Sequence, residues 1–476
     1  MNSRNGTRHL FLILLLVASA ARGATAQQGL RETFGPGVDG DVGGVQLGSE
    51  MQRLTIDQTA FPLARCNDNS PAIFYFRPAS RREDANKWLI NLQGGGSCGS
   101  GIACAERWFS VNQNFGMKNM TSEGFPAGTV GNGILARDNP RNPFATYNHV
   151  FIHYCSSDVW SGTADNAVVT GFDFGALARG QQACTQEYTI SFLGRRIFEA
   201  VIETLRRNGV PPLVFNAQGP PQVMPDLDDA GFVVLSGGSA GGGGVINNLD
   251  LLRDTLPGPR VVGLSDSSFR PPKDDMDLSQ TRLCVNHGAC TVDEQNLWDF
   301  TEGPFAVWGA LGGTDASCLT YHADDPHQCA DSRHVLTDHV TTPYFVRMDL
   351  VDPGAVEDYQ REGIFMAGAP DPHPGTPEHE PLGIREFAEA SRAGILALGS
   401  RQRTTHENIG FTPGAFAPLC GQHDTLRNDD EVYRTAVRWR GGRPLDMLTV
   451  WRAWLAGNTP SILAAANETD SVCPEQ

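Results

Sequence analysis

A serine set between glycines at the end of an apolar run constrains this chain most. Residues 233–242 read VVLSGGSAGG, so Ser239 is the centre of a Gly-x-Ser-x-Gly pattern. After a buried parallel strand, this pattern makes a sharp turn that leaves the serine hydroxyl accessible at the carboxyl edge of the sheet. Residues 245–252 then have apolar spacing typical of a helix. We therefore predict a strand, a turn and a helix, with Ser239 as a nucleophile.

The pattern has two other interpretations. Because glycine and serine are common, it also fits a plain glycine-rich loop. The glycine run 241–244 would suit a phosphate, but no lysine follows it and no acidic residue stands where a ribose would need one. The apolar patterns on both sides favour the nucleophile of a serine hydrolase.

Other apolar runs along the chain have the length of strands, and a segment with helical spacing lies between two of them. This alternation predicts an α/β protein with a mostly parallel central sheet, covered by helices on both faces. Ligands of such sheets collect at the carboxyl ends of the strands, where Ser239, Asp352 and the glycine turn 94–96 all fall. The expected strands are 88–92, 149–154, 231–235, 261–264 and one that starts at 343–348, and the expected helix is 192–205.

The amino end predicts export. Basic residues precede the apolar segment 10–17, and the small residues 24–26 are typical of a cleavage site. We expect residues 1–26 to be a signal peptide, because the apolar segment is too short to span a bilayer. An uncleaved membrane anchor is the alternative. The Gly-rich residues 27–49 predict a flexible lead-in.

The remaining residues, 50–476, contain no clear linker and predict a single domain with insertions. No other long apolar run is present, so we expect a secreted protein, extracellular or periplasmic, without a membrane span. The net charge of −17 argues against a nucleic acid as partner and makes a polyanionic substrate less favoured.

Eleven cysteines in an exported chain predict disulfides and bridged loop insertions. The odd number leaves at least one thiol without a partner in the chain. Cys155 directly follows a predicted core strand, so it is our candidate for a buried free thiol. Pairs close in sequence are the natural bridges: Cys98 with Cys104, Cys284 with Cys290, and Cys318 with Cys329.

A serine nucleophile needs a base, and the base needs a carboxylate that orients it. In this architecture the chain order is serine, acid, histidine. Asp352 follows the strand that ends near residue 351 and precedes a Pro-Gly turn, which makes it the candidate acid. Asp349 and Asp358 are its rivals, and a surface aspartate that only caps a turn is the plain alternative.

Among the later histidines, His423 is the candidate base. It follows Cys420, whose disulfide would hold the loop rigidly. Its rivals lie in proline-rich or polar segments: His373, His379 and His406.

The developing oxyanion needs backbone N–H donors. The residue after the nucleophile, Ala240, supplies one, and the early glycine turn supplies two more from Gly95 and Gly96. A tight bend beside a small Cys98–Cys104 loop is the structural alternative for this turn.

Four stretches together resemble the pectin acetylesterase/Notum carboxylesterases, a family of secreted α/β-hydrolases. The longest stretch is unusual enough to be highly specific, and residues 263–267 (GLSDS) add a weaker match. The four are LQGGGSC at 92–98 with Cys104, FIHYCSSDVWSG at 151–162, LSGGSAGG at 235–242 and FAPLCGQH at 416–423. The resemblance implies the α/β-hydrolase fold, the triad Ser239, Asp352 and His423, and an oxyanion hole of Gly95, Gly96 and Ala240.

The chain departs from the family at the early turn. The family often has an acidic residue before the glycines and a tryptophan after them, whereas this chain has Gln93 and no tryptophan. In the lipid-removing branch, aromatic residues near this turn line an acyl pocket. Their absence favours a short acyl group over a long one.

We therefore expect a secreted serine carboxylesterase that removes short acyl groups, acetyl first, from a polysaccharide. The alternatives are an esterase for lipid, long-chain acyl or polyester substrates, a non-catalytic secreted binding protein, and a metal-dependent deacetylase. We expect no cofactor and assign no metal site. Two histidines and two aspartates lie between Cys318 and Cys329, and we interpret them as a solvated disulfide loop in preference to a metal site.

Overall fold

The apolar runs form one mixed sheet, which is ten-stranded in the part of the chain that this computed structural model describes. Every neighbouring pair from β16 to β5 is parallel, and β2, β1 and β4 add antiparallel strands at the other edge. In spatial order the strands are β16 (Ile462–Ala464), β13 (Gly414–Ala417), β12 (Tyr344–Arg347), β11 (Arg260–Asp266), β10 (Phe232–Gly238), β3 (Lys87–Leu92), β5 (Asn148–Ile152), β2 (Ile73–Arg77), β1 (Met51–Thr55) and β4 (Gly128–Thr129).

The described residues are 51–108, 119–172, 185–206, 214–215, 222–223, 225–271, 305–356, 382–399 and 411–474. The expected signal peptide (1–26) and lead-in (27–49) lie outside them. The rival residues Asp358, His373, His379 and His406, and the Cys284–Cys290 pair, also lie outside them. Within the described residues, no helix is long and apolar enough to cross a membrane.

The central strands are buried along nearly their whole length. After its first residue, every residue of β10, β11 and β3 is buried. This matches the continuous apolar runs expected of parallel strands covered on both faces. The fold class predicted from the sequence is therefore confirmed.

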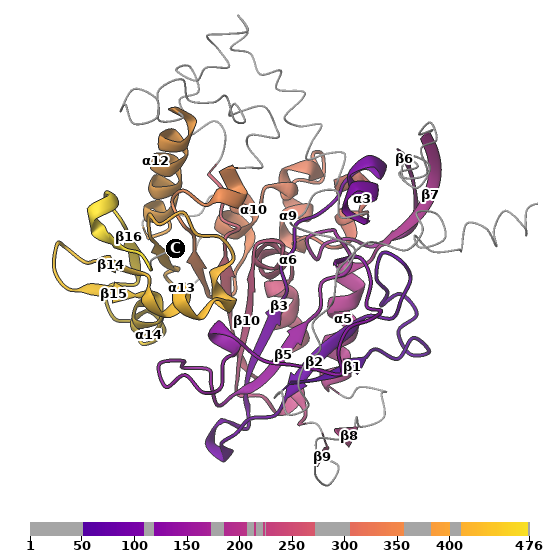
Figure 1. Cartoon of the computed structure of the whole chain (residues 1–476), viewed down its shortest axis with the longest axis horizontal. Helices are drawn as coiled ribbons and strands as arrows, with labels where there is room; N and C mark the ends of the chain where they lie inside the picture. Colours follow the sequence, from indigo (N-terminus) through magenta and orange to yellow (C-terminus); the bar gives the residue numbers. More distant parts are fainter. Residues whose placement is uncertain are drawn as a thin grey trace, which may run out of the picture.

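Helices pack against this sheet and against one another (Figure 1). The helix α6 (Ala240–Thr255) lies against β10, β11 and β3, while α12 (Leu382–Ala397) and α14 (Met447–Leu455) lie against β13 and β16. The helix α5 (Gly194–Arg206) buries an apolar stripe in the same core. Small sheets complete the fold: β15 (Pro444–Asp446), β14 (Ala436–Arg438) and β17 (Ser471–Val472), and the pair β8 (Val214–Phe215) and β9 (Gln222–Val223).

A second hydrophobic cluster lies beyond the main sheet. The antiparallel pair β6 (Ala164–Phe172) and β7 (Thr185–Phe192) extends away from the sheet, and α3 (Gly101–Trp108) packs on β6 (Figure 1). The cluster includes buried Trp108 and Trp308. The Trp308 indole N–H donates to the Cys98 carbonyl at 2.8 Å, so the cluster supports the segment that follows the glycine turn.

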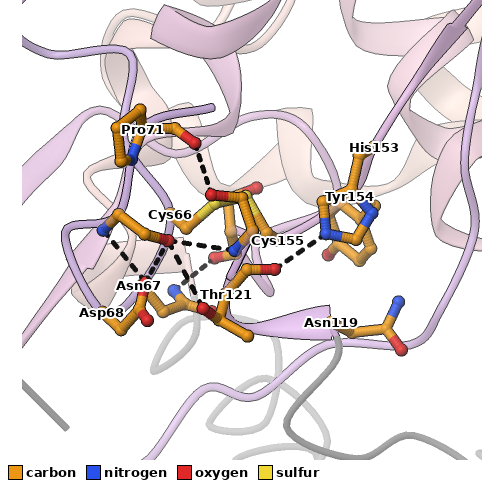
Figure 2. Close-up of a disulfide and its surroundings, with 12 residues drawn as sticks. Cys66, Asn67, Asp68, Pro71, Asn119, Thr121, His153, Tyr154 and Cys155 are labelled. Atoms are coloured by element: carbon orange, nitrogen blue, oxygen red, sulfur yellow. Dashed lines mark hydrogen bonds between the residues drawn. A yellow bond between two sulfur atoms is a disulfide. The ribbon is translucent and has the colours of Figure 1, made fainter. Parts of the chain in front are cut away.

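Four disulfides join the described cysteines. The pairs Cys98–Cys104 and Cys318–Cys329 are present, and Cys420–Cys473 holds the segment before His423. The expectation of a free Cys155 is wrong, because Cys155 is bonded to Cys66. Figure 2 shows this bridge beside Asn67 and Thr121. β5 pairs with β2, and the loops at their ends meet, although 89 residues separate the two cysteines in sequence.

We expect the Cys66–Cys155 bridge to stabilise the fold more than the short one. Chain entropy alone predicts ~4–5 kcal/mol for closing a loop with a separation of 89 residues and ~2–3 kcal/mol for a separation of 6. The double variant Cys66→Ala/Cys155→Ala should therefore lose more free energy of unfolding in guanidinium than Cys98→Ala/Cys104→Ala. Equal losses in the two variants would contradict this ranking.

Candidate active site

Ser239 occupies the tight turn between the end of β10 and the start of α6. Its backbone is left-handed, with φ 54° and ψ −128°, a conformation that a non-glycine residue adopts only under constraint. The constraint comes from close packing, because a Cβ on Gly238 would collide with the carboxylate of Asp424, and one on Gly237 with the Gly241 carbonyl. A Cβ on Gly241 would lie 2.1 Å from the Leu92 carbonyl oxygen, so close packing requires both glycines of the Gly-x-Ser-x-Gly pattern.

The structure brings the three predicted triad residues together. The Ser239 hydroxyl lies 2.9 Å from His423 Nε2, and His423 Nδ1 lies 2.7 Å from Asp352 Oδ1. Asp352 is fully buried and also accepts the Ala355 N–H at 3.1 Å, so it is no surface residue that only caps a turn. A carboxylate at Nδ1 requires the N–H on that nitrogen, which leaves the Nε2 lone pair to accept the serine proton.

The rival carboxylate, Asp349, has a different role. It accepts the backbone N–H groups of Val351, Cys420 and Gly421 at 3.1, 3.1 and 3.0 Å. Burial raises the pKa of Asp349 to about 6, against the opposing charge of Arg347. Asp349 therefore anchors the loop that carries His423, while Asp352 contacts the imidazole.

Further buried groups anchor the same loop. Asp266, at the end of β11, accepts the N–H groups of Thr425 and Leu426 at 2.6 and 3.2 Å. The Arg347 guanidinium donates to the side chain of Gln422 at 2.6 Å. Sequence analysis did not assign these positioning residues, although Asp266 lies inside the GLSDS match and Gln422 inside the FAPLCGQH match.

The electrostatic surroundings favour a charged His423. Burial by itself would lower the pKa of the imidazole, but the hydrogen bond and charge of Asp352 raise it, and the nearby carboxylates of Asp424 and Asp266 add to that effect. The net result is a pKa above the ordinary value of 6.5. The protonated form of the imidazole is therefore stabilised at this position.

The early glycine turn lies directly against the nucleophile. A Cβ added to Gly94 would lie 3.1 Å from the Ser239 Cβ, and both Gly95 and Gly96 have left-handed φ angles of 141° and 63°. Among the described residues we find no hydrogen bond from the N–H groups of Gly95, Gly96 or Ala240. The assignment of these three N–H groups as oxyanion donors stays a prediction.

The long stretch 151–162 supports this turn and contributes no reacting group. The Trp160 indole donates to the Gln93 carbonyl at 3.1 Å, and the Gln93 side chain accepts the Tyr154 N–H at 3.1 Å. Asp158 is buried and accepts the Gly194 N–H at 2.7 Å, and burial raises its pKa to about 6. The Arg107 guanidinium donates to the Gly95 carbonyl at 2.5 Å and completes the support.

A strand–serine–helix turn on a mostly parallel sheet, with Ser, Asp and His in that chain order, defines the α/β-hydrolase class. Residues 46–213 match the family model for pectinacetylesterase. The palmitoleoyl-protein carboxylesterase notum1 of Xenopus laevis is 32% identical over 384 residues, which are 79% of this chain and 62% of that protein. The human palmitoleoyl-protein carboxylesterase NOTUM is 30% identical over 369 residues, 76% of this chain and 59% of that protein.

Solved structures show the same fold. A crystal structure of the Wnt deacylase Notum from Drosophila matches with a TM-score of 0.60 and 23% identity, covering 90% of this chain and 99% of that one. The resemblance to the pectin acetylesterase/Notum carboxylesterases, inferred from four motifs, is therefore confirmed. This chain spans about three fifths of the length of the two curated relatives above.

Substitutions of Asp352 and Asp349 should have clearly different effects on kcat. We expect Asp352→Asn to lower kcat by a factor on the order of 10³–10⁴, because the wrong imidazole tautomer is then stabilised. Its remaining activity should fall at lower pH than in the wild type, since removing the Asp352 charge lowers the pKa of His423. In the wild type, kcat/KM should fall as pH decreases through a value above 6.5.

The matched variant Asp349→Asn should keep kcat within about tenfold and instead lose ~1–3 kcal/mol of unfolding free energy, because loop hydrogen bonds weaken. The readouts are pH–rate profiles and denaturant unfolding curves. The reverse pattern, with Asp349→Asn nearly inactive and Asp352→Asn active, would exchange the two roles.

Gly354 tests the placement of the imidazole without touching the triad. A Cβ at this position would lie 2.5 Å from His423 Cε1, so Gly354→Ala must displace the ring. We expect kcat to fall by about 10²-fold while the fold persists, because misplacing a reacting group by about 1 Å has that cost. Gly258→Ala is the control, since a Cβ there meets nothing within 4 Å, and it should retain full activity.

Proposed function

We propose that this protein is a serine carboxylesterase that works through an acyl-enzyme. The observation that carries the proposal is the continuous hydrogen-bond chain from Ser239 Oγ through His423 to the buried Asp352. The names of the relatives, palmitoleoyl-protein carboxylesterases, and the pectinacetylesterase match support ester hydrolysis as the reaction.

In the first half-reaction, His423 Nε2 takes the Ser239 proton as the oxygen attacks the ester carbonyl. The N–H groups of Gly95, Gly96 and Ala240 donate to the oxyanion, and each such donor typically lowers the barrier by ~2.7–4 kcal/mol. The protonated imidazole then gives its proton to the departing alcohol. Water, activated by the same nitrogen, releases the acid and restores Ser239. Asp352 stabilises the imidazolium in both halves.

For the substrate, we propose short acyl groups, acetyl first, on a polysaccharide. The support is the early turn, where Gln93 precedes the glycines and Ser97 and Cys98 follow, so that no aromatic side chain extends an acyl pocket from these positions. A long unsaturated acyl group is the second candidate, because the curated relatives carry palmitoleoyl-protein carboxylesterase as their name.

We also propose that the protein acts outside the cytoplasm. Four disulfides among the described residues are typical of an oxidising compartment, and the sequence at residues 1–26 is that of a signal peptide.

The test compares p-nitrophenyl acetate, butyrate and octanoate with the wild type and Ser239→Ala. We expect acetate to have the highest kcat/KM and Ser239→Ala to lose on the order of 10⁴–10⁶-fold. A preference for octanoate would select the long-chain candidate. Equal rates in the two proteins would reject the nucleophile, and no turnover in either would favour a binding protein. Turnover that a chelator abolishes but Ser239→Ala preserves would instead indicate a metal-dependent deacetylase.

A further inference from the structure

Three histidines that play no part in the proposed esterase chemistry converge on one point. His322 caps the end of α9 (Ala316–Tyr321), His334 ends α10 (Ser332–His334), and His339 ends the π-helical turn η9 (Val335–His339). The Nε2 atom of His334 lies 2.7 Å from that of His322 and 3.2 Å from that of His339. The ring centroids are 4.9, 4.9 and 5.6 Å apart, each pair edge to face.

These distances suit a shared metal ion. Imidazole nitrogens bind zinc at ~2.0–2.1 Å, so two of them on one ion, at angles of roughly 90–110°, lie ~2.9–3.4 Å apart. The observed 2.7 and 3.2 Å are within a few tenths of an ångström of that range. The Nε2 atoms of His322 and His339 are therefore each spaced from that of His334 as two ligands on one ion would be.

The surroundings orient the nitrogens toward one another. His334 Nδ1 lies 3.0 Å from the Asp338 carboxylate, and His339 Nδ1 lies 3.4 Å from the Ser317 hydroxyl. A carboxylate at Nδ1 places the proton there and leaves the His334 Nε2 lone pair facing the other two rings, which is the arrangement around many zinc-binding histidines. His339 is fully buried while His322 and His334 are partly exposed, so an ion has access from one side.

The nearby Cys318 adds no thiolate. Its sulfur lies in the same group of atoms, all within 4.8 Å of one another, but it is bonded to Cys329. The disulfide instead fixes α9 relative to the segment that leads into α10. A set of three imidazoles without a carboxylate ligand favours a borderline transition metal over calcium or magnesium.

We propose that His322, His334 and His339 bind one divalent transition-metal ion, zinc first, through their Nε2 atoms. A solvent molecule completes the coordination. Sequence analysis assigned no metal here because it considered only the histidines inside the Cys318–Cys329 bridge. One of these, His327, packs against Phe305 at a centroid distance of 5.8 Å, while the two further ligands lie beyond the bridge.

The site connects to the nucleophile through two serines. The Ser332 hydroxyl, at the start of α10, donates to the Ser268 carbonyl at 2.9 Å, and the Ser268 hydroxyl donates to the Ser239 carbonyl at 2.5 Å. An ion that joins α9, α10 and η9 would therefore brace the segment that holds the nucleophile's turn. We infer a stabilising role for the metal, separate from the ester chemistry.

The test uses the full-length, untagged protein freed of metal by a chelator and dialysed. Zinc is titrated in competition with a chromogenic chelator, and thermal unfolding is recorded with and without zinc. We expect the wild type and the control His327→Gln to bind one zinc per chain and to gain thermal stability, because the ion binds only the folded state. His334→Gln and His322→Gln should each bind at least about tenfold more weakly and gain less thermal stability at the same zinc concentration.

Cobalt provides an independent readout, since visible absorption bands of a nitrogen-ligated site should appear in the wild type and vanish in His334→Gln. Should His334→Gln fail to fold, His322→Gln, at the partly exposed end of α9, carries the same test. Asp338→Asn should also weaken zinc binding, by about 10–100-fold, because Asp338 orients a ligand. Sub-stoichiometric binding in the wild type, or equal binding in His327→Gln and both ligand variants, would overturn the proposal and leave a histidine hydrogen-bond cluster.

Discussion

Two buried carboxylates hold the loop that positions His423, and the rest of the site depends on them. Asp266 and Asp349 accept backbone N–H groups on both sides of the histidine. Each stands at or just beyond the carboxyl end of a parallel strand, β11 or β12. Burying a carboxylate is unfavourable unless hydrogen bonds compensate it, so each one fixes several loop amides at once. The irregular residues 418–424 and the short 3₁₀ helix η11 (Thr425–Arg427) that follows them thereby form a fixed support for the imidazole.

Close packing of the neighbouring segments holds Ser239 in place. The glycines around Ser239 allow the end of β10, the start of α6, the early turn and the Asp424 carboxylate to occupy a space that no larger residue would permit. The left-handed backbone of Ser239 persists because these neighbours leave it no alternative. The same closeness brings the turn at 94–96 against the serine, so the proposed oxyanion donors and the proposed nucleophile share one support.

Disulfides and the proposed metal site cross-link segments that pack around the sheet. The Cys420–Cys473 bridge joins the histidine loop to the end of the chain, and Cys318–Cys329 fixes the helices that bear the three clustered histidines. The Ser332–Ser268–Ser239 hydrogen bonds carry that support to the nucleophile. Cross-links and an ion would thus join the irregular segments that connect the strands and helices.

Local patterns predicted the central strands and the three side chains that the structure brings together at Ser239. A seven-residue apolar strand ending in Gly-x-Ser-x-Gly predicts β10, the turn and α6, since each depends on neighbours in sequence. Short or edge strands escaped prediction: β13 has four residues between Pro413 and Pro418 and β16 has three, whereas the equally short β12 lies in the longer, mostly apolar run 343–348. The choice of Asp352 over Asp349 was open in sequence, because both follow the same strand and only their contacts tell them apart.

The pairing of segments that are remote in sequence could not be predicted either, because it too is identified only by contacts in the fold. Segments hundreds of residues apart become neighbours in the strand order β16-β13-β12-β11-β10-β3-β5. The sequence around Cys66 likewise does not identify Cys155 as its disulfide partner. The convergence of His322, His334 and His339 likewise arises only when three short helical turns pack. The sequence by itself determines residue chemistry and local periodicity. The distances between remote side chains are set by the packing of the sheet and of the loops at its edge.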